Sequence, residues 1–238
     1  MLSKSDIKFL KSLSQKKRRD ELDLFIVEGE KNVKEAIRSD FIVERVLYMN
    51  DIGEENMAKI TLLSSPSPSF AILRKKDYSE TIPIDPEKLY LALDSIRDPG
   101  NLGTIIRLAD WFGLDAIIAS EDTVDMYNPK VIQASMGAVF RVRVIYTDLY
   151  KFIKEASLST NVYGTFLNAP NIYEISLSGS GIIVMGSESN GISGEIESLI
   201  KKRLSIPSFT REGSDGSESL NVAIAAAIIC SEFRRSSV

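Results

Sequence analysis

The hydrophobic positions of this chain fall into short apolar runs that alternate with amphipathic stretches. From residue 88 onward, strands are predicted at 89–94, 115–120, 141–147, 161–167, 181–186 and 203–208. Helices are predicted at 101–113, 129–139 and 149–157, with a short helix after 186 and a last one from about Ser219. Apolar strands that alternate with helices are typical of a parallel sheet covered on both faces.

The N-terminal third predicts a smaller α/β unit. Residues 24–39 indicate a strand, a turn and a helix, and 41–49 indicate another strand. Between Ser64 and Lys88, two stretches rich in Pro, Ser and charged residues indicate loops around a domain boundary. The chain is therefore interpreted as α/β throughout, with one domain over 1–82 and a second over 88–238.

Composition narrows the chemistry. Hydrophobic residues make up 44% and charged residues 26%, as in soluble proteins. No apolar run approaches ~20 residues and the N-terminus lacks a signal peptide, so a cytoplasmic protein without membrane contact is expected. The absence of histidine excludes histidine bases and most zinc sites, and no metal is expected. The one cysteine, Cys230, lies in an apolar helical run and is expected to be buried.

The net charge of −4 conceals a basic N-terminus. Through Arg19 there are seven Lys and Arg residues against one acid. Local clusters matter more than the total for binding nucleic acid. Candidate RNA contacts are Lys16, Lys17, Arg18 and Arg19, although such a run can also be merely a solvated helix face.

Two loops after predicted strands carry polar residues at a helix start, where parallel sheets bind ligands. The first opens with Asp-Pro-Gly and places Asn101 near the start of its helix. Arg107 lies off the apolar stripe of that helix and beside Gly103, which leaves room for a close approach; the alternative is an exposed pair with Asp110. The other loop leads into Ser219 and Asn221, and Ser219 could simply cap the last helix.

The segment "VMGSESNGIS", residues 184–193, is similar to a phosphate-binding loop but differs at one position. Gly186 and Gly191 have the right spacing, yet Ile192 stands where such loops carry a lysine. Glu188 adds a negative charge where phosphates would lie. The loop therefore favours a ligand that is neutral or cationic at its centre, and its glycines allow the backbone to approach a flat base.

Three segments together resemble a known family. "LALDSIRDPGNLGTIIRLADWFG", "IVMGSESNGIS" and "LSIPSFTREGSDGSESLNVAIAAAI" resemble, in order, motifs 1, 2 and 3 of the SpoU (TrmH-like) branch of the SPOUT RNA methyltransferases. The segment "RRDELDLFIVEGEKNVKEAIRS" looks like the family's ribosomal-protein-like substrate-binding domain. The resemblance implies a catalytic domain with a C-terminal deep trefoil knot, S-adenosylmethionine as cofactor, an RNA substrate, and a homodimer packed through catalytic-domain helices.

The resemblance also assigns site residues. Its invariant polar positions, expected to be catalytic, fall on Asn101, Arg107, Glu188, Ser219 and Asn221. Positions expected to line the cofactor fall on Thr165, Leu167, Gly186, Gly191, Ile206 and Leu220. One departure is an extended segment, 208–218, between the Ile-Pro and the Ser-Leu-Asn of motif 3, which is expected to alter the lip of the site.

The implied reaction is methyl transfer to a ribose 2′-hydroxyl, which needs alignment but neither metal nor histidine. A guanidinium with a pKa above ~12 does not readily accept a proton. We therefore expect Arg107 to stabilise the developing 2′-alkoxide or the adjacent phosphate. Asn101, Ser219 and Asn221 are expected to orient the ribose, and Glu188 to hold Arg107 or Asn101.

The favoured function is methylation of a 23S-type rRNA, because the N-terminal domain resembles that of large-subunit enzymes. Two alternatives stay open: a tRNA ribose 2′-O-methyltransferase, and an RNA-binding or ribosome assembly factor that has lost catalysis. A nucleotide hydrolase built on the Gly186 loop is disfavoured by Ile192.

Overall fold

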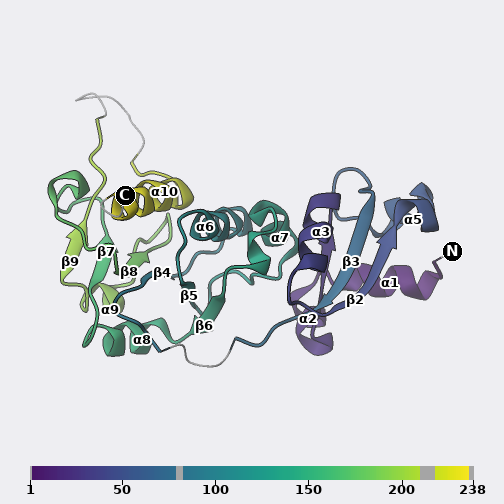
Figure 1. Ribbon diagram of the computed structural model, residues 1–238, viewed down its shortest axis with the longest axis horizontal. Helices are drawn as coiled ribbons and strands as arrows, with labels where there is room; N and C mark the ends of the chain where they lie inside the picture. The colour runs from purple at the N-terminus through teal and green to yellow at the C-terminus, as the bar shows by residue number, and fades with distance from the viewer. Residues whose placement is uncertain (1, 79–82, 210–217, 236–238) are drawn as a thin grey trace.

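The computed structural model describes residues 2–78, 83–209 and 218–235, and contains two sheets toward opposite ends of an elongated molecule (Figure 1). The N-terminal sheet has the order β1-β3-β2 with antiparallel pairs: β1 Leu24–Glu28, β2 Val43–Tyr48 and β3 Ser69–Arg74. Around it lie α1 Lys4–Ser12, α2 Lys16–Leu22, α3 Glu30–Arg38, α4 Met49–Ile52 and α5 Glu54–Ile60. The central strand, β3, lies within the region interpreted from sequence as a loop-rich boundary.

The C-terminal sheet is parallel, as predicted. Its order is β6-β5-β4-β8-β7-β9. The strands are β4 Leu89–Leu93, β5 Ala116–Ser120, β6 Val144–Thr147, β7 Val162–Thr165, β8 Gly181–Met185 and β9 Lys202–Leu204. Every residue of β4, β5 and β8 is buried, which explains their unbroken apolar runs. Because β4 pairs with both β5 and β8, the strand order reverses between β4 and β8, where parallel sheets bind ligands.

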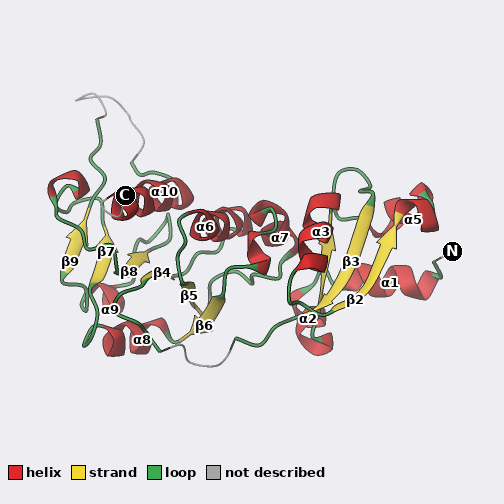
Figure 2. Ribbon diagram, viewed as in Figure 1, coloured by secondary structure: helices red, strands yellow, loops and turns green. Residues whose placement is uncertain are grey.

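Helices cover both faces of this sheet (Figure 2). α6 Pro99–Trp111, α7 Pro129–Ser135 and α10 Val222–Arg235 lie on one face, and α8 Leu149–Ala156 and α9 Gly194–Glu197 on the other. Two 3₁₀ turns, η1 Ala138–Phe140 and η2 Ile172–Glu174, complete the elements. A Cβ on Gly103 would lie 2.5 Å from the Cβ of Ala134, so the space expected beside Gly103 is filled by α7. In the described ranges, no helix is both long and apolar enough to cross a bilayer.

Several element boundaries differ from the predictions for local reasons. The helix predicted to reach residue 139 ends at Ser135, because Met136 and Gly137 take positive φ angles of 53° and 94°. The last helix begins at Val222, and its cap is Asn221, whose side-chain oxygen accepts a hydrogen bond from the Ala223 N–H at 3.0 Å. Ser219 therefore lies outside the helix, and it is not the cap.

The two sheets are joined through a packed seam. Phe25 and Phe41 of the N-terminal part contact Tyr127 and Phe140 beyond the linker, and the Phe25 and Tyr127 ring centroids are 4.6 Å apart. Lys76 hydrogen-bonds through its backbone to the Tyr127 hydroxyl. Aromatic packing of this kind adds about 0.5–1.5 kcal/mol per pair beyond the burial of area.

Arg19 belongs to this seam, which corrects its assignment as an RNA contact. Its side chain is 1% exposed and its guanidinium lies 2.7 Å from the carboxylate of Asp125, itself 10% exposed. It also donates to the carbonyl oxygens of Leu13 and Ser14. The guanidinium is thus bonded inside the protein, whereas Lys16 and Arg18 lie at the surface in ion pairs within α2.

Candidate active site

The loops after β4 and β8 are tied together at the centre of the parallel sheet. Asp94 follows β4 and is 5% exposed. Its carboxylate accepts a hydrogen bond of 2.7 Å from the N–H of Ser193, which follows β8 and its glycine loop. This bond holds motif 1 against motif 2, and it explains why a buried aspartate stands at the end of an apolar strand.

The Gly186 loop closes on itself. The N–H of Ser187 donates to the carbonyl of Gly191 at 3.1 Å, and the N–H of Gly191 donates back at 2.9 Å. Gly191 has a φ of 67°, a backbone conformation that glycine adopts without strain. Ile192 is 6% exposed and packs in the core beneath the sheet. Since these loop N–H groups are already bonded and the lysine position is buried, the loop is not built to hold phosphates.

Gly186 itself can have no side chain. A Cβ there would lie 2.0 Å from the carbonyl carbon of Gly191 and 2.2 Å from the nitrogen of Ile192. We expect Gly186→Ala to open the loop and to weaken binding of S-adenosylmethionine, the expected cofactor, by about 5- to 150-fold, which corresponds to the 1–3 kcal/mol typical of overpacking. Isothermal titration calorimetry measures this. Gly194→Ala is the matched control, because its Cβ would have no atom within 4 Å; equal affinities for the two variants would contradict the prediction.

The three motifs meet in one hydrogen-bonded chain. Asn101 of α6 donates through Nδ2 to the Glu188 carboxylate. The Oδ1 atom of Asn101 accepts a hydrogen bond of 2.9 Å from Nδ2 of Asn221, at the start of α10. The backbone N–H of Asn101 is in turn held at 2.9 Å by the capping carboxylate of Asp98. Residues 87 and 120 positions apart from Asn101 are thereby joined at one point.

Arg107 stands apart from these hydrogen-bonded residues. Arg107 is exposed on α6 and forms no hydrogen bond or ion pair with the residues that the structure describes. Its alternative partner, Asp110, binds the guanidinium of Arg141 at 2.8 Å instead. Glu188 bonds to Asn101 and not to Arg107. Ser219 lies with Glu188 on the wall of the adjoining cavity.

A cavity of about 780 Å³ opens beside these hydrogen-bonded residues, and its volume is within the range of small-molecule sites. Its walls include all six positions expected to line the cofactor: Thr165, Leu167, Gly186, Gly191, Ile206 and Leu220. Apolar side chains of α10, Val222, Ala225 and Ile229, form another wall. The apolar walls fit a flat, uncharged base, and the Glu188 carboxylate on the wall fits a cationic group. S-adenosylmethionine has both, in its adenine and its sulfonium. Asn101, Arg107 and Asn221 are outside the lining set.

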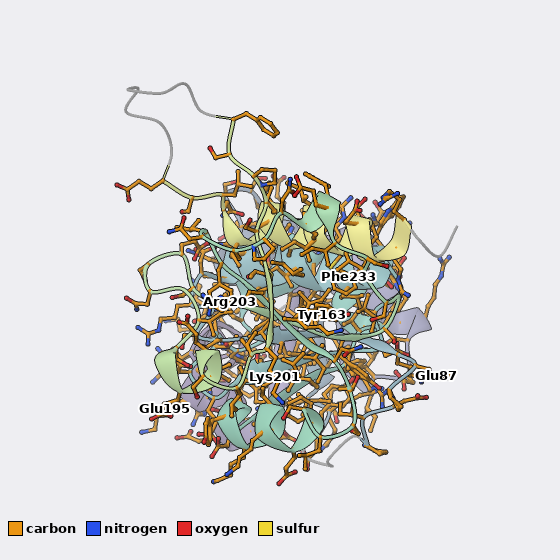
Figure 3. The ribbon with its side chains drawn as sticks, turned by 90° about the vertical axis from the view of Figure 1, so that its left-hand side faces the viewer. Glu87, Tyr163, Glu195, Lys201, Arg203 and Phe233 are labelled. Atoms are coloured by element: carbon orange, nitrogen blue, oxygen red, sulfur yellow. The ribbon has the colours of Figure 1, made fainter. Side chains whose placement is uncertain are left out.

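Three further residues on the cavity wall were missed by the sequence analysis. The Arg203 guanidinium lies 3.5 Å from the centroid of the Phe166 ring and 2.7 Å from the carboxylate of Glu197. Figure 3 views this end of the sheet and labels Arg203 together with Tyr163 and Phe233, whose rings pack edge to face with centroids 4.9 Å apart. The place of Arg203 on the cavity wall could not be predicted from sequence, because its partners, Phe166 and Glu197, come from other elements.

Comparisons with known proteins agree with this geometry. The family described as "SpoU rRNA Methylase family" matches residues 88–231, and the "MRM3-like substrate binding domain" matches residues 4–72. A curated relative from Bacillus subtilis, "23S rRNA (guanosine(2553)-2'-O)-methyltransferase RlmP", is 30% identical, covering 96% of this chain and 95% of the relative.

Solved structures are similar over the whole chain. A putative RNA methyltransferase of the TrmH family from Porphyromonas gingivalis has a TM-score of 0.87 and 35% identity, covering 99% of each chain. An AdoMet-bound rRNA methyltransferase from Sinorhizobium meliloti has a TM-score of 0.87 and 28% identity, covering 100% of this chain and 98% of that one. With its three motifs gathered around one cavity, this chain belongs to the SpoU rRNA methylase family.

Proposed function

We propose that this protein methylates a ribose 2′-hydroxyl in large-subunit ribosomal RNA, with S-adenosylmethionine as the methyl donor. The observation that carries the proposal is the pair of hydrogen bonds that joins Glu188, Asn101 and Asn221 at the edge of the cavity. The family and the name of the Bacillus subtilis relative support rRNA as the substrate.

In this proposal S-adenosylmethionine supplies an electrophilic methyl group, and the protein aligns the ribose with it. Glu188 and Asn221 together fix the orientation of the Asn101 amide, because one accepts from Nδ2 and the other donates to Oδ1. Each amide keeps a second N–H that can donate to ribose or phosphate oxygens. Holding reactants in line in this way lowers the entropic part of the barrier. Arg107 stabilises the negative charge that develops as the 2′-hydroxyl loses its proton.

The proposal assigns different roles to the two parts of the polypeptide. Residues 1–82 bind the RNA, with Lys16, Lys17 and Arg18 as surface contacts, and residues 88–238 bind the cofactor and carry the reaction. The C-terminal trefoil knot implied by the family remains a prediction, supported by the way in which the Gly186 loop, the segment after β9 and α10 all line one cavity. Such knots are rare exceptions among folds.

We further propose a homodimer packed through α6 and α10, which contact each other. Both helices expose a large apolar side chain that a partner could cover: Trp111, at the end of α6, is 83% exposed, and Ile224, near the start of α10, is 54% exposed. Sedimentation equilibrium is expected to give twice the chain mass of 26.4 kDa. A single species of the chain mass at micromolar concentration would contradict the dimer.

The test of the function is transfer of labelled methyl from S-adenosylmethionine to unmodified large-subunit rRNA, small-subunit rRNA and tRNA, each supplied separately. Label is expected in the large-subunit RNA alone, at a dinucleotide that resists alkaline cleavage, since 2′-O-methylation removes the attacking hydroxyl. Label in tRNA alone would replace rRNA by tRNA as the substrate. Cofactor binding without transfer to any of these RNAs would overturn the proposal in favour of an RNA-binding role.

A further inference from the structure

A second cavity, of about 350 Å³, lies at the seam between the N-terminal sheet and the starts of α6 and α7. The N-terminal part contributes Ile26 and Glu28 from β1 and Leu62 from the segment after α5. The C-terminal part contributes Pro99, the first residue of α6, and Pro129, the first residue of α7. None of these residues lines the cofactor cavity, so this is a separate site that both parts of the chain build together.

Most of the cavity wall is apolar and rigid. Ile26 and Ile132 are each 1% exposed. The rings of Pro99 and Pro129 add flat, uncharged surface, and each ring fixes the φ angle of its own residue. Leu62, 40% exposed, stands at the opening. Walls of this kind exclude water from the faces of a planar ring, as aromatic and apolar side chains do around unpaired RNA bases.

One wall group is a carboxylate. Glu28 is 6% exposed; one of its oxygens accepts from the Thr61 hydroxyl at 2.5 Å and the other from the Leu62 N–H at 2.9 Å. No Lys or Arg among the described residues pairs with it, and burial raises the pKa of this carboxyl above its usual value. Each carboxylate oxygen has two lone pairs, so each can accept one more hydrogen bond. A ligand that offers two adjacent N–H groups would satisfy both.

Other residues of the cavity wall carry hydrogen-bond donors. Lys130 is exposed and makes no ion pair within the described ranges, and Asn128 uses its Oδ1 to cap α7, which leaves its Nδ2 free to donate. Such groups suit the carbonyl oxygen of a base or a phosphate of the strand. A wall that combines hydrogen-bond acceptors, donors and apolar surface matches a nucleobase better than a lipid or a peptide side chain.

We propose that this cavity binds an unpaired guanine of the RNA substrate, close to the ribose that is methylated. Only guanine presents two neighbouring N–H donors, N1–H and the 2-amino group, to a carboxylate. Adenine and cytosine place a ring acceptor beside their amino group, and uracil flanks its single N–H with carbonyls, so each would set an acceptor against Glu28. This inference rests on the proposed function for the identity of the ligand as RNA.

The position of the cavity connects it with catalysis. Pro99 lies two residues before Asn101 on the same helix, a rise of about 3 Å, and Asn101 is the centre of the hydrogen-bonded chain. A base held against Pro99 therefore fixes the strand next to the ribose site. Recognition at this seam would select the RNA sequence, while the cofactor cavity selects the reaction.

The test uses four fluorescein-labelled RNA pentamers, UUGUU, UUAUU, UUCUU and UUUUU, titrated with the full chain by fluorescence anisotropy in saturating S-adenosylmethionine. The wild type is expected to bind UUGUU about 10-fold more tightly than the other three, within the 1–3 kcal/mol of a bidentate base contact. Glu28→Gln keeps the length of the side chain but places a donor where guanine needs an acceptor. It is expected to bring the four dissociation constants within about twofold of one another, by loss of that same contact.

A second variant keeps the proposal testable should Glu28→Gln fail to fold. Leu62→Trp fills the opening and is expected to remove the guanine preference, whereas Leu158→Trp, at a leucine 88% exposed elsewhere, is expected to retain it. S-adenosylmethionine affinity, expected to be unchanged, confirms folding of each variant. Equal binding of all pentamers by the wild type, absence of measurable binding, or a preference that survives in every folded cavity variant would overturn the proposal. A guanine preference without methyl transfer to rRNA would uphold the cavity and reject the proposed function.

Discussion

Arg107→Ala is expected to lower the rate of methyl transfer by about 10²–10³-fold, the usual cost of removing one group that stabilises transition-state charge. Arg107 is exposed, and it is engaged by no described residue, so its guanidinium is available to the RNA. Because Arg107 does not line the cofactor cavity, the affinity for S-adenosylmethionine should stay the same. Single-turnover transfer with saturating cofactor and RNA measures the chemical step, and calorimetry measures the affinity.

Two further variants define what Arg107 does. Arg107→Lys keeps the charge but loses the planar fork that binds two oxygens at once, and we expect it to recover little of the rate. Arg235→Ala, which removes an exposed arginine paired with Glu232, is expected to keep the wild-type rate. Nearly full turnover by Arg107→Lys would show that a single positive charge suffices, and the bidentate role would be wrong.

Arg19→Met is expected to reduce the free energy of unfolding by about 3–5 kcal/mol, the cost of breaking a buried pair from one side. Because methionine has a similar volume, the loss of stability measures the effect of the missing charge. The Asp125 carboxylate, 10% exposed, would lose its cation, and the carbonyls of Leu13 and Ser14 would lose their donor. Urea denaturation followed by circular dichroism measures the change.

The control lies one residue away on the same helix. Arg18 pairs with Glu21, and both side chains are 41% exposed, so Arg18→Met should cost less than about 1 kcal/mol. Combining Arg19→Met with Asp125→Leu should restore part of the stability, because no unpaired charge then remains in the seam. Similar losses for the two arginine variants would mean that Arg19 contributes no more than a surface pair.

The parallel sheet was predictable because its central strands are buried at every position. Strands buried on both faces have continuous apolar sequences, which are visible in the chain. β3 was missed because six residues between two loop-like stretches give too short a pattern to separate strand from loop. Its neighbours in the sheet come from 24–28 and 43–48, and no local signal marks that pairing.

The two glycines of the loop after β8 were predictable, because residue type alone dictates their geometry. Gly186 and Gly191 are required by backbone proximity and a positive φ, which only glycine accommodates well. Arg19 was assigned to the surface because a basic run looks solvated, and its partner lies 106 positions away. The Arg203 contact with Phe166 depends on tertiary packing in the same way.

The contribution of Asn221 from the last helix has a consequence for biosynthesis. The hydrogen-bonded chain from Glu188 to Asn221 closes only when α10 docks, and α10 follows every strand of the parallel sheet in sequence. A nascent polypeptide that has formed the whole parallel sheet therefore still lacks the α10 wall of the larger cavity and the Asn221 amide that bonds to Asn101. Synthesis of α10 and the onset of activity are thus coupled, so that a chain that stops before α10 does not modify RNA.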